Sequence, residues 1–273
     1  MHRWYSGADG MGPADMNSLE ATIESIGYWN NGLPSWRHAC DFVATGALPE
    51  GAASKPSPQL LPANERRRAP ESVAVALEVA LAACAAAGRD PATLPSVFTS
   101  THGDLSITDY TCATLASDPA AISPTKFHNS VHNAAAGYWT IGAHCMQAAT
   151  AISAYDASFA EGLLEAMMQL AAGAEAVLLV GYDTGATGPL RSVHDCSGLL
   201  GGALLLSHHG KGPRISARLA DGDADAPGRL GRHAGTNPMA PMLPLFDALA
   251  AGGSQAMLHA GPGRVMSVEI AHE

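Results

Sequence analysis

Aromatic and charged residues are scarce in this chain, and long apolar runs are missing. Only 5% of its 273 residues are aromatic and 15% are charged, whereas 47% are hydrophobic. Such a composition excludes a disordered chain and suits small-residue helices packed closely on a sheet. No apolar run reaches the roughly 18 residues that span a bilayer, and the N-terminal MHRWYSGADG lacks the apolar segment of a signal peptide. The sequence therefore predicts a cytoplasmic protein without a membrane span.

Basic residues and paired cysteines are also few. Lys and Arg number 15 against 25 Asp and Glu, and the resulting net charge of −10 disfavours phosphate backbones and anionic membranes. We therefore expect no nucleic-acid partner. The cysteines are odd in number and include no CxxC pair, which favours reduced thiols over a disulfide framework. They are Cys40, Cys84, Cys112, Cys145 and Cys196.

Hydrophobic periodicity predicts alternating helices and strands. The clearest helix covers 71–87, because strong helix formers follow Pro70 and end at Gly88, a suitable C-terminal cap. The Gly/Pro/Ser-rich stretch 46–62 predicts a loop. Strands are expected over 21–28, 96–101, 148–155, 176–182, 202–207, 215–219 and 265–270, and further helices over 134–146, 158–172 and 243–251. This alternation predicts an α/β fold with a mostly parallel or mixed sheet.

The segment 148–172 predicts a strand, a tight turn and a helix. This arrangement is typical of a nucleophile elbow, in which the reactive residue stands at the exposed turn. Asp156 occupies the turn, where such an elbow usually carries Cys or Ser. Because a carboxylate is a poor acyl nucleophile, the pattern indicates an acyl-transfer fold whose reactive atom has been replaced.

Several strings of this sequence carry a resemblance to a known family. SPTKFHNSVHNAAAGYW, the elbow and GAEAVLLVGYD resemble the N-terminal half of β-ketoacyl synthases, and more narrowly the short chain-length factors of aryl polyene gene clusters. The likeness extends to ERRRAPESVAVAL, SVFTSTHGD and GGALLLS, and covers residues 21–207. It implies a thiolase-like fold, here one βαβαβαββ half with a short C-terminal α/β extension.

The same resemblance suggests how the chain is divided. We predict an N-terminal extension over residues 1–20 and a synthase-like domain over 21–210. Residues 211–273 are expected to form a strand–helix–strand extension that packs on the same domain.

The resemblance also implies a function. Active members of the family hold the acyl chain on a Cys of the first half and use two His of the second half. Counting back from Gly181 through Gly173 places Asp156 at the Cys position, and a single half offers no counterpart for the two His. The chain would then be a non-catalytic, chain-length-factor-like subunit without a cofactor.

Such a subunit needs a partner. The resemblance implies pairing with an active β-ketoacyl synthase through the strand 148–155, and contact with an acyl carrier protein through that complex. The expected tunnel and interface residues are Phe127, His128, Trp139, Ala151, Ser153, Tyr155 and Phe159.

Other interpretations of the same residues stay open. Asp156 also suits a structural role, because Asp at a helix N-terminus commonly accepts backbone N–H bonds. Asp156, Cys145, or His102 paired with Asp104, would serve a self-sufficient acyltransferase or hydrolase. A homodimeric acyl-binding module is a third alternative.

Four weaker patterns complete the candidates. His128, His132 and His144 are possible metal ligands, but no carboxylate or Cys lies at a familiar spacing, and imidazoles often serve simply as hydrogen-bonded loop residues. Asn129, Ser130 and Asn133 suit side-chain to backbone bonds that order the same loop. The cluster 65–68 suits either docking of a carrier protein or a solvated turn. Glu161, Glu165 and Gln169 form a polar stripe on an otherwise apolar helix, which predicts that this helix partly faces water or polar groups of the C-terminal segment.

Overall fold

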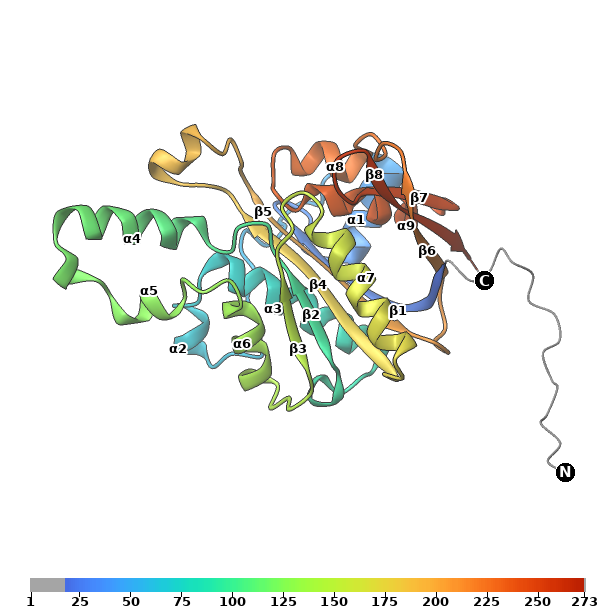
Figure 1. Cartoon of the computed structure of the whole chain (residues 1–273), viewed down its shortest axis with the longest axis horizontal. Helices are drawn as coiled ribbons and strands as arrows, with labels where there is room; N and C mark the ends of the chain where they lie inside the picture. The colour runs from blue at the N-terminus through green and yellow to red at the C-terminus, as the bar shows by residue number, and fades with distance from the viewer. Residues whose placement is uncertain (1–17, 273) are drawn as a thin grey trace, which may run out of the picture.

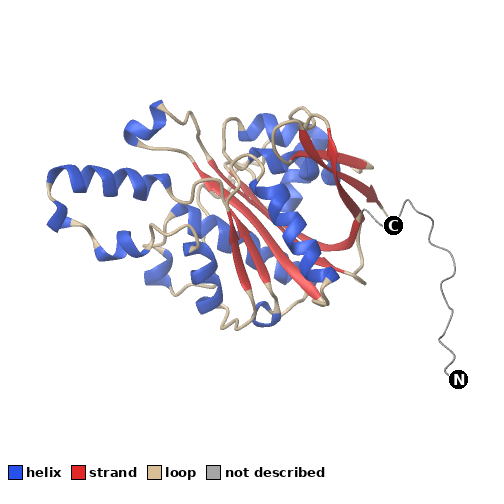
Figure 2. Cartoon of the chain, viewed as in Figure 1, coloured by secondary structure: helices blue, strands red, loops and turns tan. Residues whose placement is uncertain are grey.

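The computed structural model describes residues 18–272, which form one eight-stranded mixed sheet with helices on both faces (Figures 1 and 2). The strand order is β3-β2-β4-β5-β1-β6-β8-β7. The strands are β1 (Leu19–Asn30), β2 (Ser96–Thr99), β3 (Ala149–Ile152), β4 (Ala176–Thr184), β5 (Leu199–Ser207), β6 (Arg214–Asp221), β7 (Gln255–His259) and β8 (Arg264–Ala271). The helices are α1 (Trp36–Thr45), α2 (Ala63–Arg66), α3 (Glu71–Ala87), α4 (Leu105–Ser117), α5 (Pro124–His128), α6 (Ala134–Gly142), α7 (Ser158–Ala171), α8 (Arg229–Ala234) and α9 (Leu243–Ala251).

The main strands and helices follow the order β1-α3-β2-α6-β3-α7-β4-β5, which is the expected βαβαβαββ half. β2 pairs in parallel with β3 and with β4, whereas β5 is antiparallel to both β4 and β1. The predicted α/β class and mixed sheet are therefore confirmed. β6, β8 and β7 continue the same sheet beyond β1.

The proposed division of the chain stays a prediction. The boundary at 210/211 falls between β5 and β6, two strands that both pair with β1. Of the predicted N-terminal extension, residues 1–17 lie outside the described residues, and β1 begins at Leu19.

Most elements lie where the sequence predicts them, with shifted ends. α3 matches its predicted range, and Gly88 ends it in the left-handed conformation at φ 67°. The stretch 46–62 contains no helix or strand, as predicted. α6 ends at Gly142 instead of continuing to Met146, because the chain turns at His144, where φ is 52°. Periodicity did not predict α1, α2, α4, α5, α8 or β7.

Each face of the sheet has its own hydrophobic core. On one face, α3 and α6 cover a core that includes Phe98 and Trp139. On the other, α7 and α9 cover a core that includes Phe159 and Phe246. α3 crosses β1 so closely that a Cβ on Gly27 would lie 2.0 Å from the Val79 carbonyl oxygen. Glycine at this crossing is what allows the helix and the sheet to approach.

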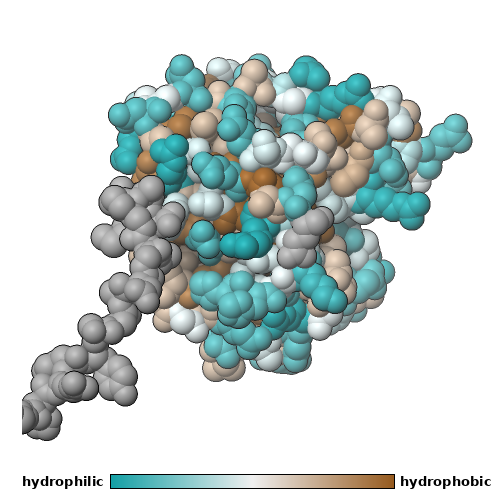
Figure 3. Space-filling view, turned by 90° about the vertical axis from the view of Figure 1, so that its right-hand side faces the viewer, coloured by the Kyte–Doolittle hydropathy of each residue, from teal (hydrophilic) through white to brown (hydrophobic). Residues whose placement is uncertain are grey.

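The surface of the molecule is uneven in hydropathy. Figure 3 shows a face covered mostly by hydrophilic residues, with hydrophobic residues visible in a recess near its centre. α5 and α6 lie away from this face, on the left of Figure 1. Several large hydrophobic side chains are exposed on or beside those two helices: Phe127, Val131, Ile141 and Met146.

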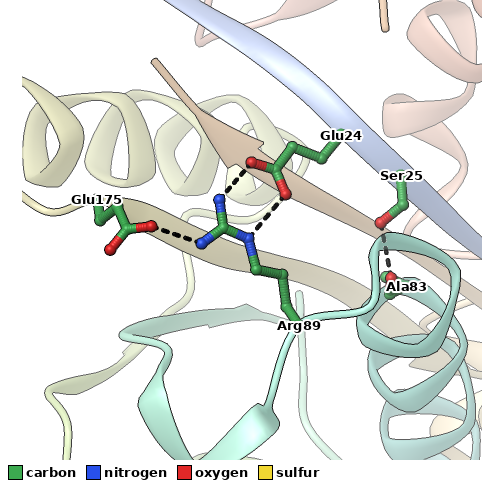
Figure 4. Close-up of polar contacts among 5 residues, drawn as sticks. All are labelled: Glu24, Ser25, Ala83, Arg89 and Glu175. Carbon is green, nitrogen blue, oxygen red and sulfur yellow. Dashed lines mark hydrogen bonds and ion pairs between the residues drawn. The ribbon is translucent and has the colours of Figure 1, made fainter. Parts of the chain in front are cut away.

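An ion-pair clamp fixes the end of α3 to the sheet (Figure 4). The Arg89 guanidinium donates two hydrogen bonds to the Glu24 carboxylate, at 2.7 and 3.0 Å, and one to Glu175 at 2.7 Å. The Glu24 side chain is 10% exposed, whereas that of Glu175 is 85% exposed. Hydrogen bonding to Arg89 holds the pKa of Glu24 below its ordinary value even though burial opposes that shift.

We expect Arg89→Met to lower the free energy of unfolding by about 2–4 kcal/mol, because it leaves the Glu24 carboxylate buried and unpaired. Glu175→Gln is the matched control and should change stability by less than about 0.5 kcal/mol, since that pair faces water. Because folding lowers the pKa of Glu24, this stabilisation is present near pH 7 and declines as the pH falls below the ordinary range of Glu. Urea unfolding at pH 7 and pH 4 measures both effects. Equal losses for the two variants would contradict the clamp.

Candidate functional site

The carboxyl ends of three parallel strands meet at one edge of the sheet and form a cleft. Thr101 and His102 follow β2, and Tyr155 and Asp156 follow β3. Open α/β sheets commonly bind ligands at this position. Two further segments, 193–196 and 236–241, close a cavity of about 340 Å³, which we call the cleft. Its lining residues are Thr101, His102, Tyr155, Asp156, Val193, His194, Asp195, Cys196, Thr236, Asn237, Pro238 and Pro241.

The turn between β3 and α7 has a strained backbone at Tyr155. This residue has φ 54° and is 58% exposed, and the exposed Asp156 follows it. The Ser158 hydroxyl donates to the Tyr155 carbonyl at 2.6 Å and accepts from the Ala154 N–H at 2.9 Å. A non-glycine residue at positive φ is typical of functional turns.

The prediction that Asp156 caps α7 is wrong. Ala157 is the N-cap residue, and its side chain offers no oxygen. Within residues 18–272 the Asp156 carboxylate accepts no hydrogen bond, and the N–H groups of Ala157 and Ser158 bond instead to the carbonyls of Ala154 and Tyr155. Asp156 therefore presents a free carboxylate to the cleft.

A pair of histidines lies beside Asp156. The His102 and His194 ring centres are 4.8 Å apart, and Tyr155 lies 5.9 Å from His102. Burial lowers the pKa of His102, and the neighbouring His194 lowers it further, while the Asp156 carboxylate opposes both. His102 is therefore mainly neutral near pH 7 and able to accept a proton.

The expected pairing of His102 with Asp104 does not occur. Asp104 instead caps α4 by accepting the Ile107 N–H at 3.1 Å, and it also accepts the Ser72 hydroxyl at 2.7 Å. The helix cap uses the carboxylate and turns it away from the imidazole.

Neither Cys196 nor Cys145 offers an exposed thiol. Cys196 lines the cleft but is 6% exposed, and burial raises the pKa of its thiol. Cys145 is 4% exposed, donates to the Leu94 carbonyl, and lies after α6, not within a helix as predicted. All five cysteines are free, and reactive cysteines need an accessible, electropositive setting.

A second and larger cavity lies among α2, α5 and α6. We call it the groove; its volume is about 920 Å³, and its walls include Leu60, Phe127, Val131 and Ile141. Phe127 is 64% exposed and Ile141 is 76% exposed. Glu65, Arg68, His128 and His144 supply polar groups to the same walls. Exposed apolar surface of this kind marks binding sites for apolar ligands or partners.

The edge strand β3 contacts α6, which forms one wall of this groove. Ala149 and Ala151 are exposed, and among the described residues no backbone group bonds to β3 from the side opposite β2. The other sheet edge, β7, is blocked, because Met257 exchanges hydrogen bonds with Asp225. An open edge strand is a template for pairing with another chain.

The polar stripe of α7 also faces β3. Glu161, Glu165 and Gln169 are half-buried, and the Gln169 amide reaches Glu165 at 2.7 Å and the Thr150 hydroxyl at 3.5 Å. The stripe therefore faces water in part, as predicted, but the polar groups that it contacts belong to α7 and β3 and not to the C-terminal segment.

The sequence-predicted tunnel residues separate into three places. Phe127 and His128 line the groove, Tyr155 lines the cleft, and Ala151 and Ser153 are exposed on β3 or directly after it. Trp139 and Phe159 differ from these, since they are buried in the two cores at 0% and 2% exposure. They reach neither cavity, and the tunnel role of all seven residues stays a prediction.

The loop residues before α6 make local bonds. His132 Nε2 lies 2.8 Å from the Ser100 carbonyl oxygen, and the Ser130 hydroxyl donates to the Phe127 carbonyl. Asn129 is buried, and Asn133 is the N-cap residue of α6, without a side-chain cap bond.

Within the described part of the chain, no three His, Cys, Asp or Glu residues are arranged to hold a metal ion. No helix among residues 18–272 is both long and apolar enough to cross a bilayer.

Asp183 and Asn237, which sequence reasoning missed, are the buried polar residues at the base of the cleft. Asp183 is 1% exposed and accepts the Ser100 hydroxyl at 2.5 Å and the Thr101 N–H at 2.8 Å. Burial raises the pKa of Asp183 to about 7, although these hydrogen bonds oppose the shift. One feature of the sequence could have indicated Asp183. It is an Asp at the carboxyl end of a continuously apolar strand, which is a usual position for site residues.

The raised pKa of Asp183 predicts a pH-dependent stability. The unfolded chain loses this proton near pH 4, whereas the folded chain keeps it until about pH 7. The free energy of unfolding should therefore fall as the pH rises through this window, by at most about 4 kcal/mol, and then stay level. Asp183→Asn removes the titration, so its stability relative to the native chain should grow between pH 5 and pH 8. Parallel stability curves in urea unfolding would show that the carboxyl does not titrate in this range.

Comparison with known proteins places this geometry in a family. A model of the β-ketoacyl synthase N-terminal domain matches residues 42–262. No curated protein sequence matches the chain at a significant level.

Solved structures share the fold. One chain of the complex between a ketosynthase and its chain length factor from Xenorhabdus doucetiae has a TM-score of 0.74 and 23% identity, over 92% of this chain and 99% of that one. The ishigamide ketosynthase/chain length factor has a TM-score of 0.70 and 13% identity, over 93% and 99%. A β-ketoacyl synthase from Burkholderia phymatum has a TM-score of 0.56 and 14% identity, over 84% and 70%. With its thiolase-like sheet and its family match over most of its length, this chain belongs to the β-ketoacyl synthase N-terminal domain family.

Proposed function

We propose that this chain is a non-catalytic, chain-length-factor-like subunit that pairs with an active β-ketoacyl synthase and shapes its acyl tunnel. The pathway class would be type II polyketide-like synthesis, including aryl polyenes. One observation carries the proposal: the turn after β3 has a positive φ at Tyr155 and carries Asp156, the residue that the resemblance aligns with the reactive Cys of active family members. Condensation needs a thiolate to hold the acyl chain, and Cys196, the cysteine that lines the cleft, is buried.

The open edge of β3 supports pairing with a synthase. Its exposed Ala149 and Ala151 leave room for a partner strand, and the opposite sheet edge is blocked by Asp225. α6, which contacts β3, carries the exposed Ile141, and Phe127 adds apolar surface across the groove. A synthase seated there would cover the groove and convert it into a closed tunnel.

The arginines of the 65–68 cluster support contact between the complex and a carrier protein. Arg67 and Arg68 are exposed at the end of α2, and Arg68 also lines the groove. In a chain of net charge −10 they form a local basic patch that an acidic carrier protein would meet. The solved relatives include a type II acyl-carrier protein in complex with its ketosynthase.

Intact-mass analysis tests the absence of acyl transfer by this chain. The chain alone, incubated with a reactive acyl thioester, should gain no acyl mass, whereas a co-purified synthase should become acylated at its own Cys. A covalent adduct on the isolated chain that disappears in Asp156→Asn would contradict the proposal and favour the self-sufficient enzyme. If the chain forms a stable homodimer that does not bind the synthase, the result would favour the acyl-binding module.

A further inference from the structure

Two buried polar side chains lie beside the cleft, and a surface that only shapes an acyl tunnel does not need them. Asp183 is 1% exposed and Asn237 is 3% exposed. Burying a carboxyl or an amide is unfavourable unless each polar atom finds a partner, and an apolar filling would serve packing as well. The partners of these two residues therefore show what they hold in place.

Asp183 fixes the turn that follows β2. Its carboxylate accepts the Ser100 hydroxyl and the Thr101 N–H, and the Ser100 hydroxyl oxygen accepts the Gly103 N–H at 2.8 Å. We call residues 100–103 the cleft turn. The Thr101 carbonyl in turn accepts the Ser153 hydroxyl at 2.9 Å, which ties the segment after β3 to the same place.

Asn237 fixes the remaining walls. Its amide nitrogen lies 3.2 Å from the Asp183 carbonyl oxygen and 3.2–3.3 Å from those of Ser197 and Gly198, the residues before β5. The Thr101 hydroxyl donates to the Pro238 carbonyl at 3.2 Å. Asp183, Asn237 and Thr101 thus bond to the cleft turn, to Pro238, and to Ser153, Ser197 and Gly198, which lie next to the other lining residues.

The same network reaches the groove. The Ser100 carbonyl oxygen lies 2.8 Å from His132 Nε2, and the Tyr182 hydroxyl donates to the His132 carbonyl at 3.4 Å. His132 lies between Val131 and Asn133, which both line the groove. We call residues 129–134 the groove loop.

We propose that Asp183 and Asn237 form one buried polar node that holds the cleft walls in a single arrangement and, through Ser100 and His132, couples them to the groove loop. A ligand or partner that displaces the cleft turn would then also displace a wall of the groove. The coupling depends on contacts within this chain and stands apart from the proposed pairing with a synthase.

Hydrogen exchange of the full chain, followed by mass spectrometry, tests the coupling. In Asp183→Ala, amides of the cleft turn and the groove loop should exchange about tenfold faster, because the side-chain hydrogen bonds of Asp183 are lost. Residues 196–198 should keep nearly native rates, since Asn237 bonds to the backbone carbonyl of Asp183. Asp183→Asn keeps the shape and should restore rates close to those of the native chain. The matched control is Asp225→Ala, which removes a carboxylate that accepts the Met257 N–H and should affect only residues around β7.

Ser100→Ala provides a milder variant if Asp183→Ala does not fold. It removes the hydroxyl that joins Asp183 to Gly103 and leaves the carboxyl in place, so the cleft turn and the groove loop should again accelerate together. Native rates in the groove loop while the cleft turn accelerates would overturn the proposal. Equal acceleration of every segment, β7 included, would also overturn it, since the node would then serve stability alone.

Discussion

Ala151→Glu is expected to weaken the pairing of this chain with a synthase partner at least about 100-fold. Ala151 is exposed on β3, at the sheet edge that lacks a second neighbour among the described residues. A partner strand paired there would cover the new carboxylate, and burial of an unpaired charge in an interface is unfavourable by several kcal/mol. Co-expression, affinity purification and titration of the separated subunits measure the loss.

Gln255→Glu is the matched control for this substitution. It adds one negative charge at an exposed position of β7, the blocked edge of the same sheet. Its pairing should stay within about twofold of the native chain. Gln255→Glu should lower the free energy of unfolding by less than about 1 kcal/mol, since the new carboxylate lies opposite Glu269 on β8. Ala151→Glu should unfold at the native urea concentration. Undiminished pairing by Ala151→Glu would remove β3 from the interface, and equal losses in both variants would point to a general effect of charge.

The alternation of helices and strands was predictable because their hydrophobic patterns are strong. β4 and β5 are buried at every position and read as continuous apolar runs, and α3 ends at the glycine that predicts its cap. α1 and α4 were not predicted, although α1 is amphipathic, and side-chain caps define where both helices begin. Ser35 caps α1, and Asp104 caps α4.

The arrangement of the candidate site was harder to predict from sequence. His102 and His194 are 92 positions apart, and only the meeting of β2 with the loop before β5 brings their rings together. The role of Asp156 was misjudged because Asp is the common cap at such a turn, whereas here the N–H groups at the start of α7 bond to backbone carbonyls instead. The hydrophobic pattern predicts which residues end a strand, whereas tertiary packing determines which of those residues come into contact.

Gly137→Trp is expected to shorten the products of the assembled synthase without unfolding the chain. Gly137 lies on α6 and lines the groove, and no heavy atom lies within 4 Å of the position that its Cβ would take. A large side chain there enters the space proposed for the growing acyl chain. Overfilling a packed space is unfavourable by about 1–3 kcal/mol, so the longest native product should fall at least about tenfold. Mass spectrometry of the products, with the same synthase, measures the change.

Two glycine variants separate occupancy of the groove from damage to the helix. Gly137→Ala should raise the free energy of unfolding by about 0.5–1 kcal/mol and leave product length unchanged, because alanine favours the helix and fills little space. Gly142→Trp, one and a half turns further along α6, should destabilise the chain, since even a Cβ there lies 2.9 Å from the Leu60 side chain. If Gly137→Trp left product length unchanged in a folded, paired subunit, the groove would not hold the growing chain. The proposed pairing through β3 would still stand in that case, because the edge strand and the groove are tested by different substitutions.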